Sequence, residues 1–299
     1  MSSNDIKVTI GMCVKNSEST VKEALQSTLS QDVPNVFFEL LIVDGYSRDN
    51  TLKIVKTFLR KTDIQSKIFL ENKGLPHARQ MIVDNARGKY IVWVDGDMIL
   101  TKDFIKSQFE FMEKNPLVGI AKGKYSSFGR ETHHENIVAA LENVEFLLNT
   151  MYEGATNSKA LGTSGCIYRT IAIREIGGFD LELIGVGEDM DVENRIRNAG
   201  WLLHVTSAPF YETRRESWRL LWNEYFWHGC GGRRLFEKDW QLFDFYKMIP
   251  PVAIIAEFLR IPSAYKLTRQ RIVLLLPLHY TFKRIAWFSG FIKSGFEKN

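Results

Sequence analysis

The sequence predicts an α/β fold, a mainly parallel sheet flanked by helices, followed by an aromatic-rich helical extension. Short runs rich in Val, Ile and aromatic residues alternate with stretches of helical spacing in the first half of the chain. Such alternation implies parallel strands joined by helices that cover the sheet. After Ser207 the chain changes to long aromatic-rich segments of helical spacing, interrupted by Pro250–Pro251, Pro262 and Pro277.

Five strands are expected from runs of β-branched and aromatic residues. They are Lys7–Val14, Phe37–Asp44, Lys67–Leu70, Lys89–Asp95 and Val118–Lys122. The helices between them are expected to begin at residues that suit a helix start, namely Ser17 or Ser19, Asp49 and Pro76. The stretch 126–157 is expected to be helical and mixed in character.

The composition is that of a globular protein in a reducing environment. With 299 residues, 45% hydrophobic and 25% charged, the chain can bury one large core, or one core and a smaller appendage. Its three cysteines show no C-x-x-C spacing, which argues against a disulfide framework and a structural zinc site. The first residues lack the basic and apolar regions of a secretory signal, so we expect a cytoplasmic protein.

The tail of the chain is basic and aromatic. From Thr213 onward it contains 15 Lys/Arg and 7 Asp/Glu, a net charge of +8, which leaves about −4 for the part before it. The many aromatic residues favour an anionic membrane surface over nucleic acid as the partner. The longest uncharged apolar run, Ile272–Phe282, is shorter than the ~20 residues of a spanning helix.

We therefore expect the tail to attach peripherally to the inner face of the membrane. Trp287, Phe288 and Phe291 are the residues expected to enter the lipid. The alternatives are a homodimer interface, or packing of these helices on the preceding part of the chain.

Polar residues fall at the carboxyl ends of three predicted strands. They are Lys15–Asn16, Asp44, and the pair Asp95 and Asp97 of an Asp-Gly-Asp turn. Because ligands of such sheets bind at the carboxyl ends of the strands, we expect these residues to converge on one edge. Two carboxylates separated by one glycine can face a single divalent cation, which would hold a diphosphate. The alternative for the turn alone is an ordinary acidic strand end.

Two residues near this edge are candidates for binding a nucleotide. The Asp44 carboxylate can accept hydrogen bonds from a base imide or a ribose hydroxyl, whereas the rest of its segment is explained by a turn and the helix cap Asp49. Arg79 lies early in the third helix and can reach a base or a phosphate. The alternative for Arg79 is an ordinary surface arginine.

A late Glu188–Asp189 pair has the features of a catalytic base. It opens a helix whose apolar positions Val192 and Ile196 are four residues apart, and the helix dipole favours an ionised carboxylate there. An ionised Asp can take the proton of an acceptor hydroxyl as that oxygen attacks an anomeric carbon. The alternative, simple capping of the helix, is weakened by the glycine loop of Gly185 and Gly187.

In their order along the chain, these motifs resemble the family 2 glycosyltransferases of GT-A fold. The pieces are KNSES, DGYSRDNT, GLPHARQMIVDNARGKYIVWVDGDM, GTSGCIYR, and GGFD followed by GVGEDMDVENRIRNAGW. They cover roughly Ile6–Thr213, and the ordered set is far more specific than any one piece. The resemblance implies an inverting, metal-dependent hexosyltransferase in glycan or glycolipid assembly. It would use a UDP- or GDP-sugar donor, a divalent cation (Mn²⁺ or Mg²⁺), and a saccharide or lipid-linked acceptor.

The resemblance also implies roles for single residues. Asp189 would be the catalytic base, and Asp95 and Asp97 would hold the metal. The donor would be bound by Cys13, Lys15, Asn16, Asp44, Arg79 and Asp95, and acceptor or loop roles would fall to Ser164, Gly165, Glu188 and Glu212. Residues 1–212 would form the GT-A catalytic domain, with the donor side in roughly 1–125 and the acceptor side and base in roughly 126–212. Residues 213–299 would form the helical extension.

The chain departs from the family pattern at three positions. Lys15 stands where an aromatic residue is usual, and Gln80 stands where asparagine is usual. Glu212 lies near the place where many members have a metal-binding histidine, and His204 is expected to belong to the strand before it. The chain lacks the Q-x-x-R-W signature of processive synthases, so we expect a non-processive enzyme.

Several features have other interpretations. The aromatic stripe in Trp218–Gly229 is typical of core packing, with an acceptor platform as the alternative. His133, His134 and His279 have no partners at metal-binding spacing and are expected to be structural or solvent-facing. A nucleotidyltransferase would normally carry a basic glycine-rich loop after the first strand, and a nicotinamide oxidoreductase would carry G-x-G-x-x-G there; neither is present. A catalytically silent membrane-bound relative is the third alternative, against which the joint presence of Asp44, Asp95, Asp97 and Asp189 argues.

Overall fold

The structure is a computed structural model that describes residues 6–126, 136–149, 154–155, 160–183, 186–214, 216–240 and 249–296. The chain separates into two compact units. Unit 1 comprises Met1–Ser126, Glu153–Ile184 and Glu188–Thr213, and unit 2 comprises Ser127–Tyr152, Gly185–Gly187 and Arg214–Asn299. Unit 2 is thus assembled from stretches that are interrupted by parts of unit 1.

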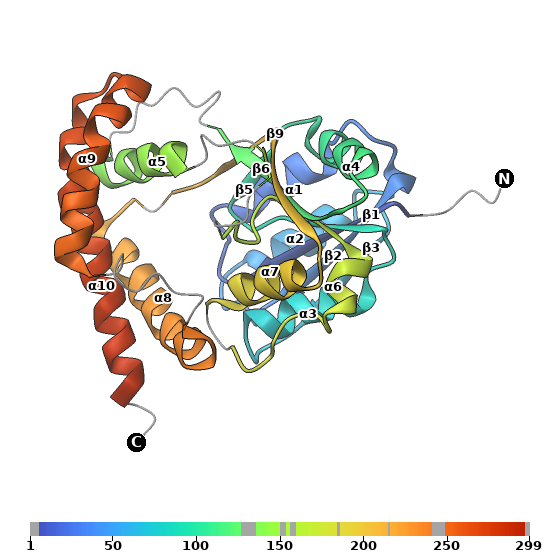
Figure 1. Cartoon of the computed structure of the whole chain (residues 1–299). Coiled ribbons are helices and arrows are strands. Elements are labelled where there is room, and N and C mark those ends of the chain that lie inside the picture. Colours follow the sequence, from blue (N-terminus) through green and yellow to red (C-terminus); the bar gives the residue numbers. More distant parts are fainter. Residues whose placement is uncertain are drawn as a thin grey trace. The chain divides into compact units, whose positions relative to one another are not determined.

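Unit 1 is built on one mixed sheet of nine strands (Figure 1). The order across the sheet is β3-β2-β1-β4-β8-β6-β9-β5, with β7 paired to β9. The strands are β1 (Val8–Val14), β2 (Phe38–Asp44), β3 (Ser66–Leu70), β4 (Tyr90–Trp93), β5 (Met98–Leu100), β6 (Val118–Tyr125), β7 (Gly154–Ala155), β8 (Cys166–Arg169) and β9 (Leu202–Glu212). The first four strands are parallel, as expected.

The second half of the sheet differs from a simple parallel arrangement. β8 lies between β4 and β6 and is antiparallel to both, whereas β6 and β9 are parallel. β5 pairs antiparallel with the end of β9. His204 lies in β9, as the sequence predicts. The expected α/β fold with helices flanking a sheet is confirmed, and the antiparallel insertion is an addition to it.

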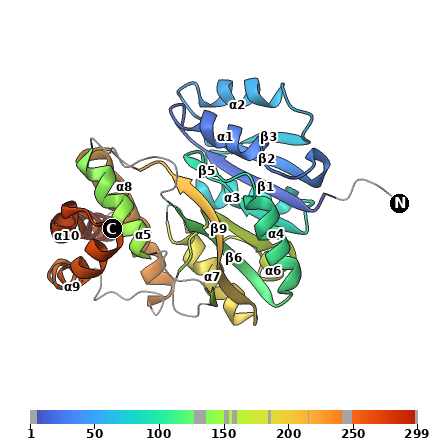
Figure 2. The same ribbon diagram turned by 90° about the horizontal axis from the view of Figure 1, so that it is seen from above.

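Helices cover both faces of this sheet. They are α1 (Val21–Leu29), α2 (Thr51–Leu59), α3 (Leu75–Asn85), α4 (Phe104–Lys114), α6 (Thr170–Glu175) and α7 (Glu188–Asn198), with a short 3-10 turn at Asn35–Phe37. Figure 2 shows α1 and α2 beside β1–β3 on one side. On the other side, residues of α3, α6 and α7 such as Ile82, Ile173 and Ile196 share one buried cluster with Val43 and Trp93 of the sheet.

Close packing between α3 and the sheet requires a glycine in β1. A Cβ at Gly11 would lie 2.7 Å from the Ile82 side chain and 3.1 Å from the Trp93 ring. Because real Cβ contacts are rarely so short, a larger residue would push α3 away from the strands. The start of α3, which carries Arg79, is held near the strand ends by this contact.

Unit 2 is a group of packed helices. They are α5 (Ile137–Asn149), α8 (Trp218–Lys238), α9 (Pro250–Thr268) and α10 (Leu276–Phe296), with a 3-10 segment η4 (Arg271–Leu275). α8 and α10 approach closely at two glycines. A Cβ at Gly229 would lie 1.9 Å from the Trp287 carbonyl oxygen, and one at Gly290 would lie 1.9 Å from the Phe226 carbonyl oxygen. This crossing therefore depends on glycine at both positions.

A cluster of ionisable side chains is buried in unit 2. Lys283 of α10 donates to Glu142 Oε1 at 2.8 Å and to Glu145 Oε2 at 2.6 Å, both on α5. His279 Nε2 lies 3.2 Å from Glu142 Oε1, and His279 is fully buried. Burial alone would raise the pKa of Glu142, but Lys283 and His279 hold it down to about 2. The sequence analysis expected His279 to be structural or solvent-facing, and it is a buried residue of unit 2. His133 and His134 lie outside the described residues.

Two aromatic residues expected to enter a membrane are instead part of the interior of unit 2. Trp287 and Phe291 are 5% and 6% exposed and stack with ring centroids 5.1 Å apart. Phe236 of α8 packs edge-on against Phe291 at 5.7 Å. This expectation was wrong because the aromatic face of α10 is used to pack on α8. Within the described part of the chain, no helix combines the length and the apolar character needed to cross a bilayer.

Candidate active site

The strand ends that carry polar residues lie side by side in unit 1. β1 pairs with β2 in a register that places Val14 opposite Asp44, and with β4 in a register that places Gly11 opposite Trp93. Lys15, Asn16, Asp44 and Asp95 therefore all follow neighbouring parallel strands at one edge of the sheet. The convergence predicted from the sequence is confirmed, and we call this edge the strand-end site.

Asn16 ties two loops of the strand-end site together. Its backbone adopts φ 50°, its amide nitrogen donates to Ser47 Oγ at 2.9 Å, and its side-chain oxygen accepts from the Arg48 amide at 2.9 Å. Lys15 is exposed, and its side-chain carbons lie 3.1–3.3 Å from where a Cβ would stand at Gly45. Asn16 thus has a structural role in these loops, and the carbon chain of Lys15 packs against the turn at Gly45 that follows β2.

Asp44 presents one oxygen without a partner. The side chain is 1% exposed, and its Oδ2 accepts a hydrogen bond from the Ser47 amide at 2.9 Å. Its Oδ1 is buried and accepts no hydrogen bond from any described residue. Buried acceptors are nearly always bonded, so an unbonded carboxylate oxygen at a strand end is a position for a donor group of a ligand. A base imide or a ribose hydroxyl has the required donor.

Contacts with Ser164 and Met98 hold Asp95 in place. Its Oδ2 accepts a hydrogen bond from the Ser164 hydroxyl, and its backbone amide contacts Met98 Sδ at 3.3 Å. Burial raises the pKa of Asp95, while the Arg79 guanidinium and the Ser164 hydroxyl lower it. A nearby cation would therefore favour the ionised form of this carboxyl.

Asp97 and Glu212 lie next to Asp95. The Asp97 carbonyl accepts from the Thr213 amide at 2.9 Å, which fixes the Asp-Gly-Asp turn against the end of β9. Met98 of β5 is paired with Glu212 of β9. The Glu212 charge also raises the pKa of Asp95, so the two carboxylates are close enough to repel each other. The Asp-Gly-Asp turn and Glu212 thus lie next to each other at the end of β9.

A buried ion pair joins α3 to α7. Arg79 Nη1 donates to Glu188 Oε1, and the two side chains are 8% and 2% exposed. Burial raises the pKa of Glu188 to about 7, although Arg79 opposes the shift. Burial alone would lower the pKa of Arg79, but Glu188, Asp95 and Asp189 hold it above its ordinary value. Glu188 Oε2 accepts no hydrogen bond from the described residues. Arg79 is therefore not an ordinary surface arginine.

Cys13 lies near this ion pair. It lies in β1 and is partly buried. Burial raises the pKa of its thiol to about 12, with Arg79 acting against this and Asp95 and Glu188 adding to it. The thiol is therefore neutral near pH 7, and its contribution is to shape the site rather than to react.

Asp189 faces a lysine that the sequence analysis missed. Asp189 Oδ1 accepts from the Met190 amide at 2.8 Å, and Oδ2 lies 3.7 Å from where a Cβ would stand at Gly162. Lys122 Nζ lies 3.7 Å from that same point, and it donates to the Leu161 carbonyl at 2.5 Å. Lys122 also lowers the pKa of Asp95, so it lies between the Asp-Gly-Asp turn and the late carboxylate. The only sequence signal was a lysine at the end of the predicted apolar strand Val118–Lys122.

Glu193 was also missed, and it positions the loop in front of Asp189. Its side chain is fully buried and accepts from the Leu161 amide at 2.8 Å and from the Gly162 amide at 2.8 Å. Burial raises the pKa of Glu193 to about 7, and the Asp189 charge adds to the shift. Glu193 follows Asp189 by one helical turn, which is a signal that spacing alone could have provided.

Gly165 and Gln80 hold the backbone segments around the site. Gly165 has φ +67°, its amide donates to the Trp93 carbonyl at 3.1 Å, and a Cβ there would lie 2.6 Å from the Phe210 ring. Gln80 accepts from the Phe179 amide at 2.7 Å, so it fixes the Gly-Gly-Phe-Asp turn. Gly185, predicted as part of a mobile loop, lies outside the described residues.

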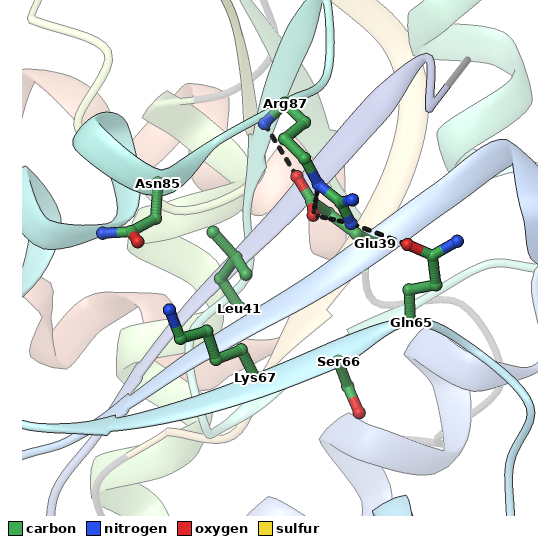
Figure 3. A pocket seen from close by; sticks show the side chains of 7 residues that line it. All are labelled: Glu39, Leu41, Gln65, Ser66, Lys67, Asn85 and Arg87. Carbon is green, nitrogen blue, oxygen red and sulfur yellow. Dashed lines mark hydrogen bonds and ion pairs between the residues drawn. The ribbon is translucent and has the colours of Figure 1, made fainter. Parts of the chain in front are cut away.

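A hollow of about 540 Å³ lies at the opposite end of these strands. It is lined by Glu39, Leu41, Gln65, Ser66, Lys67, Asn85 and Arg87 (Figure 3). Glu39 accepts from the Arg87 Nε at 2.7 Å and from the Thr9 hydroxyl at 2.7 Å, and Arg87 Nη2 donates to Gln65 at 2.7 Å. Glu39 and Arg87 bond to each other and to their neighbours, so this part of the hollow has the character of a structural brace at the start of β2.

The strand-end site therefore combines four features. An open carboxylate oxygen at Asp44 suits a nucleoside, and the carboxylates of Asp95 and Asp97 suit a hard divalent cation. Two cations, Arg79 and Lys122, lie among these carboxylates. Asp189 opens α7, where the helix dipole favours an ionised carboxylate.

Comparison with known proteins gives a family match and several relatives. The family model described as "Glycosyl transferase family 2" matches residues 9–177. A poly-beta-1,6-N-acetyl-D-glucosamine synthase of Staphylococcus epidermidis is 24% identical over 237 residues, which is 75% of this chain and 54% of that protein. An uncharacterized glycosyltransferase of Haemophilus influenzae is 29% identical over 149 residues, which is 49% of this chain and 57% of that protein. The chain thus spans about half the length of these relatives.

Solved structures share the fold at low sequence identity. The mannosyltransferase PcManGT from Pyrobaculum calidifontis, in complex with GDP-Man and Mn²⁺, has a TM-score of 0.69 and 17% identity, covering 98% of this chain and 88% of that one. S. aureus TarS 1–349 in complex with UDP has a TM-score of 0.54 and 19% identity, covering 98% of this chain and 92% of that one. These likenesses support the GT-A fold.

Proposed function

The chain belongs to the glycosyl transferase family 2, and from this premise we propose that it moves a sugar from a nucleoside-diphosphate sugar to an acceptor hydroxyl or lipid phosphate, with inversion. The observation that carries the proposal is the approach of Asp95 and Asp189 to the buried Arg79, with Asp44 at the end of a strand in the same sheet. The family match does not favour the nucleotidyltransferase, oxidoreductase or silent-relative alternatives.

The donor is proposed to bind across the ends of β1, β2 and β4. Asp44 Oδ1 would accept from the base or ribose, and Asn16 would hold the two loops that frame it. Arg79 and Lys15 would face the diphosphate, because a guanidinium and an ammonium suit phosphate oxygens. PcManGT was solved with GDP-Man and TarS with UDP, which supports a UDP- or GDP-sugar as the donor class.

Asp95 and Asp97 are the residues proposed to hold a divalent cation, Mn²⁺ or Mg²⁺, with Glu212 as a further oxygen ligand. The oxygen-only donor set of these carboxylates fits such a cation, and the repulsion between Asp95 and Glu212 is the cost that a cation would remove. When bound, the cation would supply positive charge for the departing diphosphate.

Asp189 is the proposed base. As the acceptor oxygen attacks the anomeric carbon, its proton passes to Asp189 Oδ2, and the bond between the sugar and the nucleoside diphosphate breaks with its electron pair on the phosphate oxygen. Glu193 holds the loop of Leu161 and Gly162 in front of this oxygen. Arg79 pairs with Glu188, the neighbour of Asp189, and so couples the donor side to the base.

The biological setting is proposed from the relatives and the tail. We propose a non-processive enzyme of glycan or glycolipid assembly, acting in the cytoplasm at the inner face of the membrane on a saccharide or lipid-linked acceptor. The basic, aromatic tail supports membrane attachment, and homodimerisation is the alternative. Residues 1–212 would act as the catalytic domain and 213–299 as the extension.

The test is a panel of UDP- and GDP-sugars with and without Mn²⁺, measuring release of the nucleoside diphosphate. A single donor should be turned over by the wild type and by the exposed-site control Asp103→Asn. Asp97→Asn should fold and lose most metal-supported release. Normal release by Asp97→Asn, or by the chelated wild type, would show that the metal assignment is wrong.

A further inference from the structure

Helix α9 is apolar on two opposite faces. Its inner face carries Ile261 and Ala264, which share a buried cluster with Leu141 and Val144 of α5. Glu257, one turn before Ile261, is 1% exposed and also lies on this face. The inner face alone is enough to dock α9 within unit 2.

The outer face of α9 is equally apolar but exposed. Ile255, Phe258 and Leu259 are 64%, 59% and 76% exposed. Leu274 of η4 and Leu278 in the first turn of α10 are 63% and 69% exposed. Both segments contact α9 within unit 2. Figure 1 labels α9 and α10. We call these five residues the outer apolar face.

A helix at the surface normally buries its apolar side chains and exposes its polar ones, so the exposed apolar face of α9 is unusual. Large apolar side chains that gather on a protein surface mark a place where a partner or a membrane binds. The outer apolar face therefore calls for a partner that the described structure does not include.

The charges around this face favour one kind of partner. Residues 249–296 contain seven Lys/Arg and a single carboxylate, Glu257. That carboxylate is buried and accepts from Arg260 at 2.6 Å, so it does not reach the surface. The exposed charges at the end of α9 and the start of η4 are Lys266, Arg269 and Arg271, all positive.

We propose that the outer apolar face, with Lys266, Arg269 and Arg271 at its edge, is an interfacial membrane-binding surface for anionic lipid. Ile255, Phe258, Leu259, Leu274 and Leu278 enter the boundary between headgroups and acyl chains, and the three basic residues meet lipid phosphates. The proposal identifies the surface behind the membrane attachment proposed above, and it rests on that attachment and not on the sugar-transfer chemistry.

A second copy of the chain is the weaker occupant. In a two-fold symmetric dimer the same patch meets itself, and residues 249–296 of the second copy would offer Lys266, Arg269 and Arg271 only the buried Glu257 as a carboxylate. A lipid surface supplies the missing negative charge. The earlier candidates Trp287 and Phe291 are excluded because they are buried against α8.

The test uses the full chain and vesicle flotation. Vesicles of phosphatidylcholine alone are compared with vesicles that also contain phosphatidylglycerol, at low and high salt. The apolar variant is Ile255→Ser/Phe258→Ser/Leu259→Ser, and its matched control is Leu117→Ser/Ile171→Ser, which changes residues of unit 1 that are 68% and 65% exposed. The charge variant is Lys266→Gln/Arg269→Gln/Arg271→Gln, and its control is Lys22→Gln/Lys53→Gln/Lys56→Gln, exposed positions of α1 and α2.

The expected result is specific to the α9 surface. Wild type and both controls should float with anionic vesicles, the apolar variant should lose more than about tenfold in binding, and the charge variant should lose the preference for anionic lipid and its salt dependence. Equal binding of all variants, or no binding of the wild type, overturns the proposal. A wild-type dimer that becomes a monomer in the apolar variant, without vesicle binding by either, assigns the face to a second copy instead.

Donor turnover separates this proposal from the proposed function. The variants change no residue of the strand-end site, so release of the nucleoside diphosphate with a soluble acceptor should equal that of wild type. Loss of flotation with normal turnover supports the surface. An enzyme that floats as expected but shows no turnover leaves the surface standing and removes the catalytic proposal.

Discussion

Two sets of buried carboxylates, one in each unit, are compensated differently. In unit 1, buried carboxylates keep oxygens that no described residue binds, Asp44 Oδ1 and Glu188 Oε2. In unit 2, the Lys283 ammonium donates to both Glu142 and Glu145 at 2.8 and 2.6 Å. Burying a charge is costly unless a partner compensates it. Asp44 and Glu188 thus keep an oxygen that a ligand could bind, whereas Lys283 compensates Glu142 and Glu145. Glu257 Oε2 of unit 2 also has no partner among the described residues.

The largest expected effect comes from removing the proposed base, Asp189, in unit 1. Asp189→Asn keeps the shape of the side chain but cannot accept the acceptor's proton, so we expect transfer to fall by about 10²–10⁴-fold with unchanged thermal stability. Steady-state turnover and calorimetric donor binding provide the measurement. If donor binding is lost along with transfer, Asp189 acts on the donor instead.

Removing the buried cation of unit 2 should lower stability and not sugar transfer. Lys283→Met leaves Glu142 and Glu145 buried without their cation, so we expect the free energy of unfolding of unit 2 to fall by about 3–5 kcal/mol. The control Lys293→Met, at an exposed position of the same helix, should change it by less than about 0.5 kcal/mol. Denaturant unfolding checks both.

Replacing all three buried charges of unit 2 tests whether charge or packing causes this loss of stability. Glu142→Leu/Glu145→Leu/Lys283→Met replaces the buried charges together, and such replacements are often neutral or stabilising. We expect it to regain most of the stability lost in Lys283→Met. A triple variant as unstable as the single one would mean that packing, and not charge, is responsible.

We expect a divalent cation to bind in unit 1 and not at the buried cluster of unit 2. Glu142, Glu145 and His279 bring possible ligand atoms within 4.8 Å of one another, yet the Lys283 ammonium already holds the carboxylate oxygens. We expect Mn²⁺ with a nucleoside diphosphate to stabilise the protein by about 3 kcal/mol at ~100 times the dissociation constant. Thermal shift should show this gain in wild type and Glu145→Gln but not in Asp97→Asn. Loss of the gain in Glu145→Gln alone would place the metal in unit 2.

The smallest effect concerns pH. Burial raises the pKa of Glu193 from 4.5 to about 7, so between these values the native state holds a proton that the unfolded chain has released. Stability from this group is therefore present below the unfolded pKa and falls as pH rises through the window. Glu193→Gln should reduce the slope by up to about 1.4 kcal/mol per pH unit. Urea unfolding at about pH 5 and about pH 7 measures it, and equal slopes in both proteins would contradict the assignment.

Much of the open site was predictable because it depends on local sequence. The first four strands and the polar residues at their ends follow from periodicity, and the parallel sheet then brings Asp44 and Asp95 to one edge. β8 was not predicted, since its four residues, Cys166–Arg169, are too short a run to distinguish a strand from other apolar segments.

The closed cluster was beyond any local pattern. Glu142 and Lys283 are 141 residues apart, and nothing in the spacing of either helix indicates that they meet. Lys122 was missed for a related reason, whereas Glu193 could have been found from its helical spacing to Asp189. Each acts through a loop at Leu161 whose position depends on the whole sheet. Trp287 was misassigned because aromatic composition alone does not tell a buried face from an exposed one.

The interrupted course of unit 2 has a consequence during synthesis on the ribosome. α5 emerges before unit 1 is complete, whereas Lys283 follows Glu145 by 138 residues. At ~5–20 residues per second, α5 waits roughly seven to thirty seconds with both carboxylates uncompensated. Unit 2 therefore forms last in the order of translation, and a ribosome stalled within α8 or α9 would release a chain in which α5 has no cation to fold against.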